Sequence, residues 1–314
     1  MNDVLQNLFW IIIFPGFLFT LAIGLVASWL VRKVSAMVQY RIGPPIYQPL
    51  ADVLKLMGKE ILIPQQAQRF MFIAAPLIGM SSVILLCTML WRIAISPESL
   101  FVGDVIVAIY LLVIPSLALI LGGSASASPY AAIGAAREMK LVMAYELPLL
   151  LAFIVVIIKT GGTLSLAGIA EHTPVLSISG MLAFLVALLC IQAKLGFVPF
   201  DIAEAEAELA SGVMMEYSGA LLGVWTIMHN MMLVGLPLFL VMIFMGGFGT
   251  SGAALWAGIG KYVLVLVLII LIKNTNPRMR IDQAMKFFWV YCGLALGLAV
   301  CLAIMGNYLN IAWF

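Results

Sequence analysis

Eight apolar runs divide the chain, and each is long enough to cross a membrane as a helix. A hydrocarbon core of about 30 Å requires roughly 20 residues of α-helix. The runs lack the alternation of apolar and polar residues that barrel strands require, so helices are the spanning structure that fits. The pattern therefore predicts an all-α polytopic integral membrane protein. It forms a single transmembrane domain over residues 1–314, with spans at about 8–31, 70–91, 102–122, 141–158, 176–193, 220–245, 253–272 and 287–306.

The composition agrees with this class. Apolar residues make up 64% of the chain and charged residues only 10%, whereas a soluble domain carries about 25% charged residues. An ordinary cytosolic enzyme is thereby excluded, and the high apolar content also excludes a disordered chain. The 27 glycines and 14 prolines follow no collagen-like period, which excludes a fibrous protein.

The basic residues predict the orientation. If the spans alternate in direction, thirteen of the sixteen Lys and Arg residues fall on one side of the membrane. Cytoplasmic loops carry such an excess of Lys and Arg. Segments 32–69, 123–140, 194–219 and 273–286 are therefore expected in the cytoplasm, with both termini outside the plasma membrane.

The first cytoplasmic segment contains an expected amphipathic helix. Its apolar residues, which recur near the helical period, are Leu50, Val53, Leu54, Met57 and Ile61. A helix of this kind lies in the plane of the membrane interface. Two interpretations stay open: an anchor on the membrane surface, or a docking platform for a soluble partner.

An acidic passage follows the fifth span. Its carboxylates are Asp201, Glu204, Glu206, Glu208 and Glu216. In a helix over 201–210, Asp201, Glu204 and Glu208 would lie within about 60° of one another, and Glu206 would point to the far side. With no nearby cation in sequence, the three should raise one another's pKa toward neutrality, as a proton path requires. The alternative is a solvated acidic face that contacts water or a basic partner.

Glu146 is a carboxylate inside the fourth expected span. It lies roughly 9 Å along the helix beyond Lys140, the last basic residue before it;. An ionised, unpaired carboxylate at this depth costs several kcal/mol. Glu146 must therefore be protonated, face a wet cavity, or form a buried pair, for which Arg137 and Lys140 are the candidates.

The four cysteines are scattered through apolar runs without the spacing of metal ligands. They are Cys87, Cys190, Cys292 and Cys301. Iron–sulfur and zinc sites need clustered ligands. We therefore expect four small buried hydrophobic side chains, and no cofactor or metal in this chain.

Four motifs, in order along most of the chain, make the sequence recognisable. They are Arg41-Ile42-Gly43-Pro44-Pro45 with Gln48 through Glu60; Ile133-Gly134-Ala135-Ala136-Arg137-Glu138 leading to Glu146; Pro199-Phe200-Asp201 through Glu216-Tyr217-Ser218-Gly219; and Pro277-Arg278-Met279-Arg280-Ile281-Asp282-Gln283. With them the chain resembles the membrane subunit that joins the hydrophilic and membrane arms of respiratory complex I (the NADH dehydrogenase subunit 1 family). The resemblance is closer to the counterpart in energy-converting membrane-bound nickel–iron hydrogenases and related ferredoxin-dependent complexes.

The resemblance implies a non-catalytic coupling subunit. Hydrogenase-like large and small subunits and an iron–sulfur protein would dock on the cytoplasmic side and hold the iron–sulfur clusters and any nickel–iron centre. Their ferredoxin-linked reaction, hydrogen evolution or sulfane sulfur reduction, would drive proton or sodium translocation through antiporter-like and small membrane subunits. No nucleic-acid partner is expected.

The resemblance also suggests roles for particular residues. The ion path would run through Asp201, Glu204, Glu206, Glu208, Glu216, Glu138 and Glu146. The docking interface would contain Arg41, Asp52, Lys55, Lys59, Glu60, Arg137, Arg278, Arg280 and Asp282. Its arginines would also tune the carboxylates.

Three other functions stay open. The first is the quinone-site subunit of a complex I-type dehydrogenase. The short loop from Gly43-Pro44-Pro45 to Gln48-Pro49 and the Arg137-Glu138 pair argue against it, since both resemble the hydrogenase branch. The second is a stand-alone secondary transporter, which inverted repeats would favour. The third is a purely structural anchor, which leaves Glu146 unexplained.

Overall fold

The computed structural model describes residues 2–96, 103–204, 208, 210–249, 252–309 and 313. The expectation for Glu206 lies outside these residues. The described part is all helical, as predicted, and contains no strand. Its elements are α1 (Asn2–Ile12), α2 (Phe17–Val38), α3 (Gln48–Met57), α4 (Arg69–Ile95), α5 (Asp104–Ala125), α6 (Pro129–Lys159), α7 (Leu166–Ala170), α8 (Ile178–Lys194), α10 (Gly219–Phe244), α11 (Gly252–Thr275), α12 (Ile281–Lys286) and α13 (Gly293–Leu309), with short 3₁₀ turns at Pro174–Leu176 and Gly212–Met214.

The expected polytopic membrane architecture is confirmed. Seven helical stretches of the described chain are long and apolar enough to cross a membrane, and the shorter apolar helix α8 accounts for the remaining expected run. Two expected spans are less regular than a single α-helix. The first is interrupted at Phe14–Gly16, between α1 and α2, and the last begins with a π-helical stretch, Phe287–Cys292, between α12 and α13.

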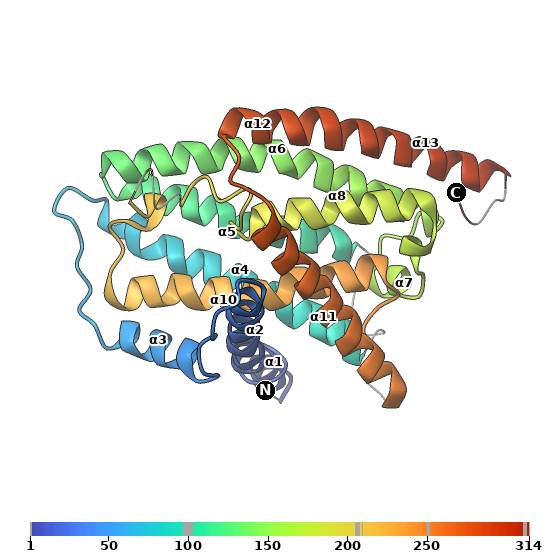
Figure 1. Ribbon diagram of the computed structural model, residues 1–314. Helices are drawn as coiled ribbons and strands as arrows, with labels where there is room; N and C mark the ends of the chain where they lie inside the picture. Colours follow the sequence, from blue (N-terminus) through green and yellow to red (C-terminus); the bar gives the residue numbers. More distant parts are fainter. Residues whose placement is uncertain are drawn as a thin grey trace.

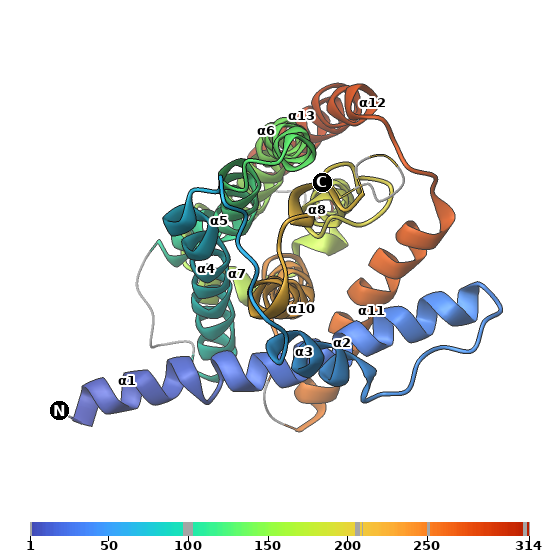
Figure 2. The same cartoon turned by 90° about the vertical axis from the view of Figure 1, so that its left-hand side faces the viewer.

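Helix α10 forms the centre of the bundle. Its sequence is apolar all round, which is the pattern of a helix buried on every side, and nearly all of its length is buried. It packs against α2, α3, α4, α8 and α11. Figure 2 shows it end-on near the middle of the molecule.

The N-terminal helices run across the others. In Figure 1, α1 and α2 are viewed nearly end-on while α6, α10 and α13 extend across the picture, and Figure 2 shows the reverse. The crossing of α2 over α10 requires Gly24, because a Cβ there would lie 2.5 Å from the carbonyl oxygen of Asn230. This arrangement places the C-terminal half of α2 beside the cavity described below.

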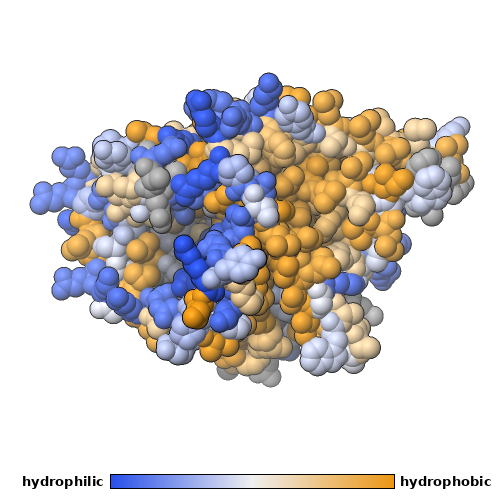
Figure 3. Space-filling view, viewed as in Figure 1, coloured by the Kyte–Doolittle hydropathy of each residue, from blue (hydrophilic) through white to orange (hydrophobic). Residues whose placement is uncertain are grey.

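The expected amphipathic helix is α3, which ends at Met57, so Ile61 lies in the coil that follows. Val53 is buried, whereas Leu50 and Leu54 are exposed. Hydrophilic residues gather at the end of the bundle that carries α3, and apolar surface covers much of α8, α11 and α13 (Figure 3). This distribution matches the asymmetry of basic residues in the sequence.

Candidate ion-coupling site

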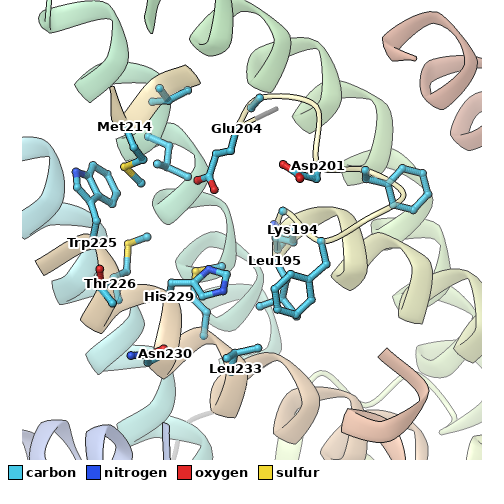
Figure 4. A pocket seen from close by; sticks show the side chains of 18 of the residues that line it. Lys194, Leu195, Asp201, Glu204, Met214, Trp225, Thr226, His229, Asn230 and Leu233 are labelled. Carbon is cyan, nitrogen blue, oxygen red and sulfur yellow. The ribbon is translucent and has the colours of Figure 1, made fainter. Parts of the chain in front are cut away.

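A cavity of about 390 Å³ lies among α2, α6, α8, α10, α11 and the loop that follows α8. Its charged lining residues are Arg32, Glu138, Lys194, Asp201, Glu204 and Lys273. The side chains of Asp201 and Glu204 point into this space from the loop, and His229 and Trp225 of α10 face them (Figure 4). The cavity therefore brings together two of the predicted loop carboxylates and the predicted Glu138.

The loop carboxylates do not share a helical stripe, so this expectation is wrong. Residues 201–204 are extended or bent. Two interactions hold the segment in this form: the Met279 backbone N–H donates to the Pro199 carbonyl at 3.0 Å, and Arg278 pairs with Asp201 at 2.6 Å. The ring of Phe200 also packs 4.7 Å from that of Phe288. The loop thus pairs with the 278–281 segment instead of forming its own helical hydrogen bonds.

Glu138 reaches the cavity because α6 and the loop approach closely at Gly134. A Cβ at this position would lie 2.9 Å from the Val213 backbone nitrogen and 3.0 Å from the Ala203 carbonyl oxygen. Glu138 follows one helical turn later on the same face of α6. It is 7% exposed and lines the cavity together with Glu204.

Glu146 forms a buried ion pair with Lys194, and not with either of the expected partners, Arg137 and Lys140. The Lys194 side chain is fully buried and the Glu146 side chain is 17% exposed. The Lys194 ammonium also donates to the Leu112 carbonyl at 3.0 Å and lies 5.1 Å from the centre of the Tyr145 ring. Lys194 is a cavity residue, so the pair is in contact with the cavity.

The acidic passage has no cation near it in the sequence, but the fold brings two of the predicted interface arginines to it. Glu208 pairs with Arg137 at 2.7 Å, as Asp201 does with Arg278. Both arginines are far from their carboxylates in the sequence. Glu208 is 63% exposed, and Glu216 is half-buried and does not line the cavity. Glu208 and Glu216 therefore lie outside the cavity that contains Asp201 and Glu204.

Asp52, one of the predicted interface residues, is paired within the chain. It accepts hydrogen bonds from Arg32 at 2.7 Å and from Gln48 at 2.9 Å. The Arg32 hydrogen bond lowers the pKa of Asp52, and Gln48 contributes to the same effect. This pairing fixes α3 against α2.

The remaining predicted interface residues are exposed and lie in two segments, residues 41–60 in and around α3 and residues 280–282 at the start of α12. They are Arg41, Lys55, Lys59, Glu60, Arg280 and Asp282. The side chains of Arg280 and Asp282 are 81% and 79% exposed and lie 3.7 Å apart. The coil that follows Glu60 is tied to the bundle, since the Leu62 backbone N–H donates to the Ser218 hydroxyl at 3.0 Å. We call this set of six residues the docking face.

Four titratable residues of the cavity had no functional role assigned from the sequence: Arg32, Lys194, His229 and Lys273. Lys194 and Lys273 each end a long apolar run, which is a usable signal for a cation held at the edge of the membrane. His229, alone in an apolar helix, gives no such signal. Its place beside the carboxylates depends on the tertiary fold.

The described cysteines are not clustered. Cys87, Cys190 and Cys292 are buried as expected, but Cys301 is exposed. In the part of the chain that the structure describes, no group of three or more His, Cys, Asp or Glu side chains could hold a metal ion.

The fold and the cavity define a polytopic membrane protein with an acidic loop over an intramembrane ion pair. A family model described as NADH dehydrogenase matches residues 10–305. The chain is 35% identical over 311 residues to a subunit of the NADH-quinone oxidoreductase of Syntrophotalea carbinolica, covering 92% of this chain and 93% of that protein. It is 32% identical over 293 residues to the corresponding subunit of Dehalococcoides mccartyi, covering 90% and 81%.

A solved structure has the same fold. A chain of the membrane-bound sulfane sulfur reductase, an archaeal respiratory membrane complex, superposes with a TM-score of 0.83 at 30% identity and covers 96% of this chain and 100% of that one. The chain belongs to the NADH dehydrogenase subunit 1 family, which confirms the expected family. It is a membrane subunit of the complex I-related type.

Proposed function

We propose that this chain anchors and couples a multisubunit, complex I-related redox complex in the plasma membrane. Partner subunits would transfer electrons in a ferredoxin-linked reaction, either hydrogen evolution or sulfane sulfur reduction, and the chain would link that reaction to proton or sodium translocation. The chain itself would hold no redox centre. Its likeness to a chain of the sulfane sulfur reductase supports this proposal.

One observation carries the coupling role: loop carboxylates, a buried carboxylate and a buried ion pair adjoin a single cavity. Glu204 and Glu138 face the same space as Lys194, whose partner Glu146 lies eight residues, or about 12 Å, further along α6 than Glu138;. A proton gained or lost at Glu138 or Glu204 changes the electrostatic field at Lys194. In a poorly solvated site such a change is weakly screened, so it changes the strength of the electrostatic attraction between Lys194 and Glu146.

The docking face supports the anchoring role. Its six residues are exposed and mixed in charge. Hydrogenase-like subunits and an iron–sulfur protein would bind there, close to the cavity. Antiporter-like and small membrane subunits would contact the apolar flanks of the bundle.

The test compares carboxylates that line the cavity with one that does not. Glu138→Gln and Glu204→Gln keep the size and hydrogen-bonding capacity of each side chain but remove the titratable group. The matched control is Glu171→Gln, an exposed carboxylate at the C-terminal end of α7. Ion uptake per electron is measured in sealed vesicles that contain the whole complex, and partner-subunit content is measured in the same vesicles.

The two cavity variants should retain their partner subunits but show reduced ion uptake per electron, and Glu171→Gln should match the wild type. Full coupling in both cavity variants would refute the coupling role. Loss of activity that only follows loss of partner subunits would indicate a structural anchor instead.

A quinone site is the second candidate, because the cavity has the volume of a small-molecule pocket; and the relatives from Syntrophotalea carbinolica and Dehalococcoides mccartyi belong to an NADH-quinone oxidoreductase. Thr226 lines the cavity, and Thr226→Trp would fill much of it. Saturable binding of a short-chain quinone to the purified complex, lost in Thr226→Trp, would favour this function over the ferredoxin-linked one.

A further inference from the structure

A seam between α2 and α11 contains two adjoining pockets of opposite character. The first, of about 220 Å³, is lined by the 23–30 part of α2 and the 259–263 part of α11, together with residues of α4 and α10. The second, of about 420 Å³, is lined by the 31–39 part of α2, the loop 41–44 and the end of α11 at 273–274. The two helices pack against each other, so the pockets follow one another along the same seam.

The first pocket is apolar and opens toward the lipid-facing surface. Every described residue that lines it is aliphatic or aromatic. Val26, Ile259 and Val263 are 51%, 37% and 37% exposed, whereas Trp91 is buried at 9%. In a membrane-spanning bundle, exposed aliphatic side chains face hydrocarbon. The pocket is therefore open to the membrane at its rim and closed by aromatic packing at its base.

The second pocket is cationic. Arg32, at its edge, is neutralised by Asp52, but neither Arg41 nor Lys273 forms a salt bridge with any residue in the described ranges. Lys273 lies instead 4.1 Å from the centre of the Phe197 ring. The pocket thus carries two cations without a salt bridge among the described residues, although Asp201 lies near enough to Lys273 to act on its charge.

The cationic pocket is held in place by hydrogen bonds. The loop that carries Arg41 is tied to α2 because the Arg41 backbone N–H donates to the Ala36 carbonyl at 2.7 Å and the Trp29 indole N–H donates to the Pro44 carbonyl at 3.1 Å. Across the pocket, the Gln39 amide donates to Asn274 at 3.1 Å. These contacts fix the backbone around Arg41 and Lys273.

We propose that this seam binds one anionic membrane lipid. The phosphate lies at Arg41 and Lys273, and one hydrocarbon chain occupies the apolar pocket. The distance supports the match: ten residues of α11 separate Val263 from Lys273, or about 15 Å of helix, which is the depth of one leaflet of a 30 Å hydrocarbon core. The two cations favour an anionic headgroup because of their charge. The adjoining apolar pocket favours a lipid over an acidic protein side chain, because an acidic side chain would leave the apolar pocket empty.

The test uses the full chain in nanodiscs that contain equal amounts of phosphatidylglycerol and phosphatidylcholine. Lipids that remain bound after gentle detergent extraction are counted by native mass spectrometry. Two variants perturb the seam: Arg41→Gln removes a headgroup cation, and Val26→Trp fills the rim of the apolar pocket. Their matched controls are Lys59→Gln, another exposed cation of the docking face, and Leu18→Trp, which is 50% exposed on the same helix. Neither control residue lines either pocket.

The wild type should retain one phosphatidylglycerol in preference to phosphatidylcholine. Arg41→Gln should weaken that preference about fivefold, the effect of one basic residue at an anionic surface, and Val26→Trp should abolish retention. Both controls should behave as the wild type. An equal loss in Lys59→Gln would show a non-specific charge effect, and retention of lipid by Val26→Trp would place the lipid elsewhere; either result overturns the proposal.

The same measurement on the intact complex separates this proposal from the proposed coupling function. If Arg41→Gln leaves the lipid content of the complex unchanged, an acidic partner side chain, and not a lipid, occupies the cationic pocket. Ion uptake per electron is not part of this readout, so a failure of coupling in the cavity variants leaves the lipid site unaffected.

Discussion

The buried pair between Lys194 and Glu146 allows a sharp test of the energetics of the bundle. Lys194→Met and Glu146→Leu replace each charged group by an apolar side chain of similar size, and the double variant removes both. Because the Lys194 side chain is fully buried, Glu146→Leu leaves its ammonium with the Leu112 carbonyl as its remaining hydrogen-bond acceptor among the described residues. Removing one partner of a buried pair costs about 3–5 kcal/mol, so we expect a loss of this size.

Lys194→Met should be milder. The Glu146 side chain is 17% exposed, so its carboxylate can reach water or take up a proton when its partner is lost. The double variant should lie within about 1 kcal/mol of the wild type, since replacing a buried ion pair by apolar residues is often neutral. The three values together give a double-mutant cycle with an interaction energy of a few kcal/mol.

The assay is reversible unfolding of the full chain in mixed micelles, followed by circular dichroism as denaturing detergent is added. The reasoning fails if Glu146→Leu costs less than about 1 kcal/mol, or if the double variant equals the sum of the two single variants. Additivity would mean that the two side chains do not interact in the folded state.

Three further predictions concern the loop, the α2–α3 contact and the docking face. Gly134→Ala should lower the free energy of unfolding by about 1–3 kcal/mol, because the new Cβ overpacks against the loop;. Gly260→Ala should leave this free energy unchanged, because no atom lies within 4 Å of its new Cβ. Equal effects of the two variants in the unfolding assay would contradict the close approach at Gly134. The lowered pKa of Asp52 means that its pair with Arg32 stabilises the fold above the unfolded pKa of about 3.9 and that this contribution is lost as pH falls through the lower folded pKa. The contribution should be under about 1 kcal/mol because both side chains are at least a third exposed;, and Asp52→Asn should flatten the acid limb of a stability–pH profile. Arg280→Glu should leave stability unchanged but reduce the partner subunits that co-purify, and full recovery of partners would count against the docking face.

The sequence predicted the helices because hydrophobic run length depends only on local composition and bilayer thickness. The eight runs, the amphipathic helix and the asymmetry of charge all follow from such local signals. The breaks at Phe14–Gly16 and Phe287–Cys292 do not, because hydropathy averaged over a span does not detect a change of helix geometry within it.

The carboxylates that line the cavity were candidates before the structure, but the cavity cations Arg32, Lys194 and Lys273 were not. Asp201 and Glu146 stood out as carboxylates in apolar surroundings, and the family resemblance added Glu138, yet the positions of all three relative to cations depend on contacts between residues far apart. Lys194 is 48 residues from Glu146, and Arg278 is 77 from Asp201. The expected helical stripe was wrong for the same reason: helical spacing describes which residues could share a face, but the hydrogen bonds from the 278–281 segment stabilise an extended conformation instead.

The balance of charge in the cavity gives a physical reason to favour coupling over a static structural role. Three cations, Arg32, Lys194 and Lys273, face three carboxylates, Glu138, Asp201 and Glu204. Asp201, Arg32 and Lys194 each have a salt-bridge partner, whereas none of the salt bridges in the described chain involves Glu138. On the proposed function, Glu138 is therefore the group whose protonation can change without breaking an existing pair. A proton taken up there removes a negative charge from the cavity near Lys194, which shifts the electrostatic attraction on the Lys194 ammonium toward its existing partner Glu146. The Lys194–Glu146 pair and Glu138 then act together through charge alone, and the proposed coupling requires no covalent or metal-centred step on this chain.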